Sequence, residues 1–377
     1  MFDVPYDRAR FRSGIKWSKH ETEVIPAWVT DMDFDPPPAV IETLQGYLDR
    51  GDLGYARLVD QLSPAFAAWQ NKHHGWQPDV GRIRVFTSAL HALEAALWNC
   101  TSPGDGVVVF TPIYYPFLDA IEKSGRRLVD VPLDPDGWRI DADRLAAAVD
   151  DGTRVVLFCT PHNPTGRVFD EDEIRAVADI AERHNLLVIS DEIWGDLTHD
   201  APHRPLATCD ERFGGRLMTL GSASKAFNIA GLRCAVAHVD NAPLNKIFDS
   251  MSGHLQGAPS TLGVAATVAA WTLCDDWLAA LRQTLADRRD HLERRLAERI
   301  PSVGFDVPEA TYLAWLDFNA TSLSADPAAF LLEHAGVALS SGPQFGTGGR
   351  GFARLNFATS TEIIDDLVDR IARAVPD

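Results

Sequence analysis

Residues 217–233 read LMTLGSASKAFNIAGLR, an apolar run followed by a loop that holds two serines, a lysine and an arginine. The run Leu217–Leu220 is continuous rather than alternating, as is typical of a strand buried on both faces. A lysine near hydroxyls and apolar neighbours can have a lowered pKa, and its neutral amine can then form a Schiff base with a carbonyl. The hydroxyls and the guanidinium can hold a dianionic phosphate. Taken alone, such a loop more often carries a solvated lysine. Whether Lys225 forms a Schiff base therefore has to be judged from the motifs in the rest of the chain.

Five further apolar runs of the same continuous kind occur on either side of this stretch. They are Ile83–Phe86, Val107–Phe110, Val155–Cys159, Leu186–Ile189 and Cys234–Val239. Helical stretches separate several of them, and the clearest begins at Asp170, where Asp170 and Glu173 resemble a capping box. Strands that alternate with helices predict a mostly parallel α/β sheet, and ligands bind such sheets at the carboxyl ends of the strands.

The pattern divides the chain into three regions. Residues 1–50, with their prolines, tryptophans and aspartates, are expected to form an N-terminal arm and a helix that pack with the small domain. Residues 51–275 are expected to form a large domain around the sheet. Residues 276–377 begin with a long charged helix and are expected to form a smaller α/β domain.

The charge balance narrows the classes of partner. The chain has 377 residues, with 35 Lys and Arg against 53 Asp and Glu, and a net charge of −18. Because phosphate backbones and anionic lipid surfaces select basic faces, this balance disfavours nucleic acid and membrane partners. The first residues carry charge where a signal peptide has its apolar core. Five scattered cysteines without a CxxC pair indicate a reduced, cytoplasmic protein with neither a disulfide framework nor a metal site.

Two more predicted strand ends carry polar groups. Asp191 follows the run Leu186–Ile189, and an acid there is costly unless it is paired, for example with a protonated ring nitrogen. A loop cap is an equally good interpretation of Asp191 alone. Asn163 lies in the stretch CTPHNPTG at 159–166, where prolines and glycine make a stiff turn that presents one amide. A plain strand-to-helix turn is the alternative for Asn163.

Three weaker signals lie at other predicted strand ends or on a strand. Thr87 or Ser88 can begin a helix whose free N–H groups bind an anion, although most such caps bind none. Tyr114 can stack on a flat heterocycle, or it can simply pack. Arg354 lies on a predicted strand, where its fork suits a substrate carboxylate or a structural salt bridge.

Together these features supply a Schiff-base lysine, a phosphate cradle, a stacking ring, an acid for a ring nitrogen and a carboxylate clamp. Their order resembles that of the fold-type I pyridoxal 5'-phosphate (PLP) enzymes, the aspartate-aminotransferase-like group, over nearly the whole chain. The resemblance implies an α/β fold with a mostly parallel central sheet, helices on both of its faces and a smaller α/β C-terminal domain. It also implies PLP as the cofactor, bound by residues 51–275.

The resemblance also implies a role for each candidate residue. Lys225 is the catalytic residue and carries PLP as a Schiff base, Asp191 pairs with the pyridinium nitrogen, and Asn163 hydrogen-bonds the phenolic oxygen. Tyr114 stacks on the ring, and Arg354 binds the substrate α-carboxylate. The residues implied to hold the phosphate are Ser88, Ala89, Ser222, Ser224 and Arg233.

Finer motifs are similar to those of the MalY/PatB-type cystathionine β-lyases, a C–S lyase branch of the aminotransferases. They are WVTDMDF at 28–34, GY at 54–55, PHNP at 161–164, SKAFNIAGL at 224–232 and ATYLAWLD at 310–317. In that family Tyr55 would reach the phosphate of the neighbouring subunit's cofactor. The resemblance therefore implies a homodimer with composite active sites.

Three positions depart from the pattern of that subfamily. Trp194 stands at a cofactor position where the subfamily usually has histidine, and its indole can donate a hydrogen bond but cannot accept one. The stretch Thr87–Leu90 replaces a turn that usually contains glycine. Thr30, a candidate substrate-binding residue, stands where a small alanine is usual.

The implied function is that of a PLP-dependent C–S β-lyase. Such an enzyme eliminates a thiol, homocysteine in the case of cystathionine, from a cysteine S-conjugate and leaves pyruvate and ammonia. A PLP-dependent aminotransferase is the alternative, because the same residues serve both reactions. A third hypothesis is a regulatory binding protein that keeps the fold and the cofactor but acts by docking on a partner.

Overall fold

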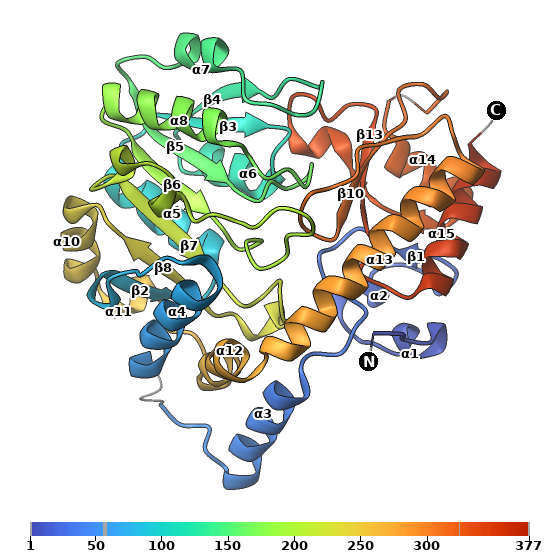
Figure 1. Cartoon of the computed structure of the whole chain (residues 1–377), viewed down its shortest axis with the longest axis horizontal. Helices are drawn as coiled ribbons and strands as arrows, with labels where there is room; N and C mark the ends of the chain where they lie inside the picture. Colours follow the sequence, from blue (N-terminus) through green and yellow to red (C-terminus); the bar gives the residue numbers. More distant parts are fainter. Residues whose placement is uncertain (1, 56–58, 324, 376–377) are drawn as a thin grey trace.

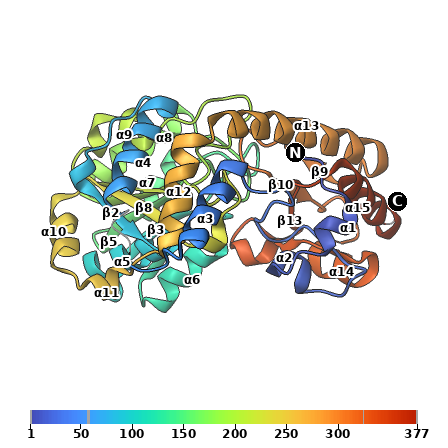
Figure 2. The ribbon, with the colours of Figure 1, turned by 90° about the horizontal axis from the view of Figure 1, so that it is seen from below.

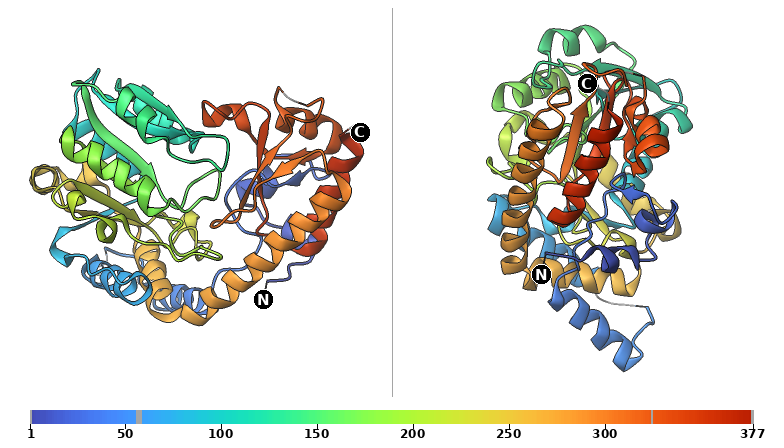
Figure 3. Two further views of the ribbon diagram at one scale, coloured as in Figure 1. Left: turned by 45° about the horizontal axis from the view of Figure 1, so that its top comes forward. Right: turned by 90° about the vertical axis from the view of Figure 1, so that its right-hand side faces the viewer.

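A computed structural model describes residues 2–55, 59–323 and 325–375. The chain forms a large body around one sheet and a smaller body around another, and the long helix α13 (Asp275–Arg299) runs from the first to the second (Figures 1 and 3). The predicted α/β fold is confirmed. The division into three domains stays a prediction.

The large body is built on a seven-stranded sheet in the order β2-β8-β7-β6-β5-β3-β4. Only β8 runs against its neighbours, so the sheet is mostly parallel, as predicted. All six predicted runs are strands. The strands are β2 (Ile83–Phe86), β3 (Gly106–Thr111), β4 (Arg127–Pro132), β5 (Thr153–Cys159), β6 (Leu187–Asp191), β7 (Leu217–Gly221) and β8 (Ala235–Val239).

The continuous apolar runs reflect burial on both faces of this sheet. Val108 and Phe110 of β3 pack into the core under α7 (Ala142–Ala148) and α8 (Glu171–Arg183). Val107 and Val109 pack into the opposite core, under α5 (Ala89–Cys100) and α6 (Tyr115–Lys123). The predicted capping box of α8 is present, because Asp170 and Glu173 each accept a hydrogen bond from the other's backbone N–H.

The remaining elements of the large body surround the sheet. They are α4 (Val59–His74), η1 (Val80–Arg82), α9 (Leu206–Cys209), η2 (Glu211–Phe213), η3 (Ala230–Leu232), α10 (Ala242–Ser250), α11 (Gly253–Gln256) and α12 (Thr261–Leu273).

The smaller body has a four-stranded antiparallel sheet in the order β12-β13-β10-β9. Its elements are β9 (Gly304–Phe305), β10 (Leu313–Asp317), α14 (Pro327–Ala335), β11 (Val337–Ala338), β12 (Ser340–Ser341), η4 (Gly342–Phe345), β13 (Phe352–Asn356) and α15 (Thr361–Ala374). Helix α15 packs along α13.

The N-terminal arm joins the two bodies. After α1 (Tyr6–Arg10) and α2 (Ile15–Ser18), strand β1 (Ile25–Pro26) pairs in parallel with β11 of the smaller body. The next helix, α3 (Pro38–Arg50), lies beside α12 (Figure 2). Helices α3 and α4 both cover the apolar surface of α12. The expectation that residues 1–50 pack with the small domain stays a prediction.

Within the described ranges, no single helix is long and apolar enough to cross a membrane. Helices α12 and α13 meet such a test only as a pair, with a bend of 83° between them. The same ranges contain no cluster of three or more His, Cys, Asp or Glu residues that could hold a metal ion.

Candidate active site

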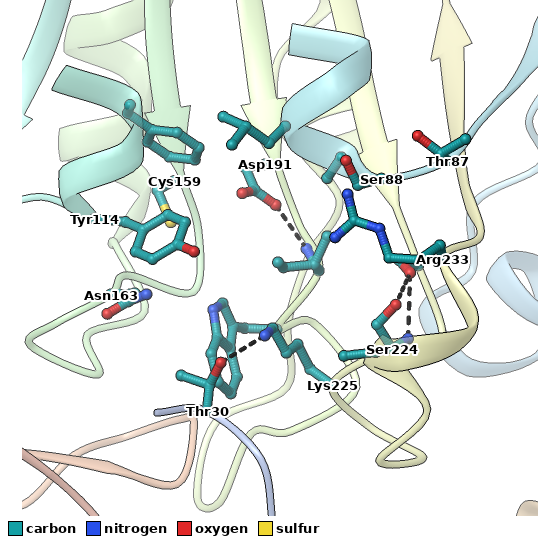
Figure 4. Close-up of a pocket in the computed structure, with 17 residues that line it drawn as sticks. Thr30, Thr87, Ser88, Tyr114, Cys159, Asn163, Asp191, Ser224, Lys225 and Arg233 are labelled. Atoms are coloured by element: carbon teal, nitrogen blue, oxygen red, sulfur yellow. Dashed lines mark hydrogen bonds between the residues drawn. The ribbon is translucent and has the colours of Figure 1, made fainter. Parts of the chain in front are cut away.

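A pocket of about 830 Å³, including space open to solvent, lies where β2, β3, β5, β6 and β7 end (Figure 4). These strands run in the same direction, so the residues that follow them meet at one edge of the sheet. Eleven of the thirteen predicted site residues line this pocket. They are Thr30, Ser88, Ala89, Tyr114, Asn163, Asp191, Trp194, Ser222, Ser224, Lys225 and Arg233.

Lys225 lies in the loop after β7 and points into the pocket. Its Nζ donates a hydrogen bond to Thr30 Oγ1 at 2.6 Å and lies 5.8 Å from the centre of the Trp194 ring. Burial lowers the pKa of Lys225 to about 8, with the positive charge of Arg354 acting in the same direction and the carboxylates of Asp31 and Asp191 opposing it. A substantial fraction of this amine is therefore neutral and nucleophilic near pH 8.

Asp191 is the last residue of β6, and only 3% of it is exposed. Burial raises the pKa of its carboxyl to about 7, although the Ile193 N–H donates to Oδ1 at 3.2 Å and Lys225 adds a favourable charge. Among the described residues, Asp191 forms no ion pair. A buried acid with this raised pKa fits a protonated ring nitrogen, which would hold it in the charged form.

Opposite Asp191, several groups suited to an anion surround one end of the pocket. Ser88 caps the N-terminus of α5 by accepting a hydrogen bond from His91 N–H. The N–H groups before His91 have no intrahelical partners, as at the start of any helix, and can bind an anion. The hydroxyl oxygens of Ser222 and Ser224 lie 2.6 Å apart. Arg233 adopts a left-handed backbone with φ of 54° and forms no ion pair with any described residue. Ser222 Oγ donates to Cys234 O at 2.8 Å, so a phosphate dianion would accept hydrogen bonds from the remaining donors, which are the first N–H groups of α5, the Ser224 hydroxyl and the Arg233 guanidinium.

Arg354 and Asn163 meet beside the pocket. Arg354 lies on β13, is 3% exposed, and donates from Nη1 to Asn163 Oδ1 at 2.8 Å. Its Nη2 donates to Trp28 O and to Ser340 Oγ, both at 3.1 Å, whereas its buried Nε has no partner among the described residues. Burial lowers the pKa of the guanidinium to about 10, which still leaves it charged at neutral pH. It is a buried cation without a carboxylate, as a substrate carboxylate site requires.

The aromatic candidates lie in different places. Tyr114 lines the pocket and is half-buried, and burial raises the pKa of its phenol. Trp194 is buried and meets the ring of Tyr312 edge to face, with 4.9 Å between the ring centres. Tyr55 is fully exposed on the loop after α3 and does not line this pocket.

Sequence reasoning missed several residues of the site. Cys159, Ile193 and Ala230 line the pocket, and burial raises the pKa of the Cys159 thiol. Tyr312 donates from its hydroxyl to Thr30 O at 2.7 Å and so fixes the arm beside Lys225. Three of these residues lie within stretches quoted above, Tyr312 in ATYLAWLD, Cys159 in CTPHNPTG and Ala230 in SKAFNIAGL, so those motifs were the available signal.

Three comparisons with known proteins agree with this geometry. The family model described as aminotransferase class I and II matches residues 27–371. Cystathionine beta-lyase PatB of Bacillus subtilis is 34% identical, with 99% of this chain and 99% of that protein covered. The solved structure of the PLP-bound C-S lyase from Staphylococcus hominis superposes with a TM-score of 0.93 at 30% identity and covers 99% of this chain and 98% of that chain. Cystalysin from Treponema denticola, whose structure contains a PLP cofactor, gives the same TM-score of 0.93, 30% identity and coverages of 99% and 98%.

Proposed function

The chain belongs to the class I and II aminotransferase family, and from this premise we propose that it is a PLP-dependent C–S β-lyase. It acts on cystathionine or related cysteine S-conjugates and releases a thiol, pyruvate and ammonia. Relatives that cover nearly the whole chain and are named cystathionine beta-lyase or C-S lyase support this function. The observation that carries it is that Lys225 and Asp191 line one pocket, while the buried Arg354 lies beside it and donates a hydrogen bond to the pocket residue Asn163.

The large body supplies the groups that would hold PLP. Asp191 would face the ring nitrogen, Tyr114 the ring, Asn163 the phenolic oxygen, and Lys225 would bond the aldehyde carbon. Trp194 adds an indole N–H and an apolar face beside Lys225. When bound, PLP supplies an electron sink for the electron pair released at the substrate Cα. The proposed phosphate ligands are Ser88, Ala89, Ser222, Ser224 and Arg233.

Lys225 moves the proton in this reaction. Because its pKa is about 8, the free amine can take the proton from the substrate Cα near neutral pH. The sulfur on Cβ then leaves as a thiolate with the electrons of the C–S bond. Lys225 can return to this thiolate the proton that it took from Cα. Thr30 holds the amine on the arm side of the pocket through the 2.6 Å hydrogen bond.

Arg354 orients the amino acid. Two parallel hydrogen bonds from its guanidinium to the α-carboxylate would fix the direction of the Cα–H bond toward Lys225. The hydrogen bonds to Asn163, Trp28 O and Ser340 hold the Arg354 guanidinium in position before the substrate binds. Thr30 lines the pocket, binds Lys225 and lies two residues after Trp28, whose carbonyl Arg354 binds, so it would meet the substrate.

The site is proposed to be complete only in a homodimer. Tyr55 is fully exposed and lies outside the pocket of its own chain, so it is available to a second copy. We place the protein in the cytoplasm, because all five cysteines are unpaired thiols. The net charge of −18 supports a small-molecule substrate over nucleic acid or an anionic membrane.

An aminotransferase is the second candidate, and the description of the matching family model favours it. The purified protein, loaded with PLP, is incubated with L-cystathionine, and homocysteine, pyruvate and ammonia are quantified. Equal amounts of the three products, absent in a Lys225→Ala variant, are the expected result. Amino transfer to an added keto acid without release of thiol would contradict the lyase and support the aminotransferase.

A further inference from the structure

Behind the loop that carries Asp191 and Trp194 lies a buried cluster of two histidine–carboxylate pairs. His203 Nε2 lies 2.9 Å from Glu192 Oε2, and the two side chains are 2% and 5% exposed. His74 Nε2 lies 2.9 Å from Asp196 Oδ1. Neither histidine lines the PLP pocket, so neither is used by the chemistry described above.

The alternation of an extended chain explains why Glu192 lies on this far side. Successive side chains of a strand point to opposite faces, so Asp191 faces the pocket while Ser190 and Glu192 point away from it. Glu192 then accepts three hydrogen bonds or contacts of hydrogen-bond length. Ser190 Oγ donates to it at 2.8 Å, Leu206 N–H donates at 3.0 Å, and His203 lies at 2.9 Å.

The side chains of the pocket residues Asp191 and Trp194 have fewer polar contacts than Glu192, although the sheet pairs the backbone of Asp191 with β5 and β7. Among the described residues, the Asp191 carboxylate accepts one hydrogen bond, at 3.2 Å from Ile193 N–H, which is itself part of the same loop. Trp194 is placed by its edge-to-face contact with Tyr312. The directions of both side chains therefore depend on where the backbone of residues 191–195 is fixed.

His203 fixes that backbone by contact as well as by hydrogen bonding. Its ring packs so closely on Gly195 that a Cβ at Gly195 would lie 2.6 Å from His203 Cδ2. The next residue, Asp196, accepts from Trp69 Nε1 at 2.9 Å, and its carbonyl accepts from Arg282 Nε at 2.6 Å. The loop is thus pinned on its far side at Glu192, Gly195 and Asp196.

We propose that His203 is a positioning residue that acts through Glu192 and Gly195 to set the directions of Asp191 and Trp194 in the PLP pocket. The inference rests on the proposed function, because it assigns His203 a purpose in holding PLP. A small displacement of Asp191 moves its carboxylate away from the ring nitrogen, and misplacements of about 1 Å can lower a rate by about 100-fold.

The test compares two variants of similar size. His203→Leu fills the space but cannot bind Glu192, whereas the amide of His203→Gln can donate to Glu192 from nearly the same place. The readouts are the dissociation constant for PLP, the visible absorption spectrum of the bound coenzyme, and kcat and KM for L-cystathionine. His291→Ala is the matched control, because it breaks a histidine–carboxylate pair of 2.8 Å with Asp365 in the contact between α13 and α15.

In His203→Leu we expect the dissociation constant for PLP to rise about tenfold, the spectrum to shift, and kcat to fall by about 10- to 100-fold with KM little changed. His203→Gln should recover most of each change, and His291→Ala should lower only the thermal stability. A His203→Leu protein that melts earlier but keeps the wild-type dissociation constant, spectrum and kcat overturns the inference. If His203→Leu does not fold, His203→Ala takes its place under the same criteria. A wild-type protein that binds no PLP overturns the proposed function itself, whereas normal wild-type behaviour with unaffected variants overturns only the role of His203.

Discussion

Lys225 Nζ donates a 2.6 Å hydrogen bond to Thr30 Oγ1, across a separation of 195 positions in the chain. Side chains of the smaller body donate hydrogen bonds to three successive backbone carbonyls of the arm that carries Thr30. Tyr312 binds Thr30 O, and Asn356 Nδ2 binds the carbonyls on both sides of it, those of Val29 and Asp31. The smaller body therefore sets the position of the hydroxyl that holds the lysine of the large body.

This contact predicts the effect of Thr30→Val, which keeps the shape of the side chain and removes the hydroxyl. A hydrogen bond that the ammonium donates favours the charged form, so its loss should move the pKa of Lys225 below about 8. Because PLP reacts with the neutral amine, the rate of PLP incorporation into the coenzyme-free protein should reach half its maximum near pH 8 in the wild type and at lower pH in Thr30→Val. Thr30→Ser should behave as the wild type does. An unchanged midpoint in Thr30→Val would refute this role.

Asp191 predicts a dependence of stability on pH in the coenzyme-free protein. The pKa of Asp191 in the folded chain, about 7, lies above the value of about 3.9 for a free aspartate. Between these values the folded state binds more protons than the unfolded state, so this carboxyl lowers the free energy of unfolding as pH rises from about 4 to 7.

Asp191→Asn removes that effect. The coenzyme-free variant should melt at a higher temperature than the wild type at pH 8, by an amount that corresponds to about 1–4 kcal/mol at most, and the difference should shrink toward pH 4.5. Loaded with PLP, the same variant should lose at least about 100-fold in turnover. A melting difference that is the same at both pH values would contradict the buried, raised pKa.

Arg354→Lys tests the carboxylate site. Lysine keeps the charge but cannot form two parallel hydrogen bonds, and a hydrogen bond to a charged group contributes about 1.5–3 kcal/mol. We therefore expect KM for L-cystathionine to rise by about 10- to 100-fold. The dissociation constant for PLP, measured in the same preparation, should change little. A large loss of PLP binding with unchanged KM would instead place Arg354 among the residues that hold the coenzyme.

The composite site predicts complementation between two inactive chains. A hybrid of Lys225→Ala and Tyr55→Ala subunits has one site in which both residues are native, so random pairing should restore about a quarter of the wild-type sites. The two variants are co-expressed and the activity of the purified mixture is compared with that of each parent. A mixture of Lys225→Ala and Asp191→Asn is the control, because both changes lie in the pocket of their own chain. Activity no higher in the first mixture than in the control would exclude the composite site.

Much of this architecture could be predicted because a strand that is buried on both faces has a continuous run of apolar residues in the sequence. Residues Val107–Phe110 of β3 and Leu187–Ile189 of β6 form continuous apolar runs, since consecutive residues face two different cores. Strand β4 was missed because it lies at the edge of the sheet, where exposed and buried residues mix and no continuous apolar run forms.

The candidate site was predictable where a polar residue follows a buried strand, as at Asp191, Asn163 and Lys225. The contacts between distant segments were not. Thr30 with Lys225, and His203 with Glu192 and Gly195, depend on how the arm and the loops fold over the sheet. No local pattern encodes such pairs, so only the three-dimensional structure brings them to light.

The proposed function requires that the amine of Lys225 bonds PLP in this pocket. The measurement that tests it most directly is reduction of the PLP-loaded protein with borohydride, followed by proteolysis and mass spectrometry. One peptide should carry an added pyridoxyl phosphate group, on Lys225, and no such label should appear in Lys225→Arg. A loaded and reduced protein that carries the label at another lysine, or none at all, would contradict it.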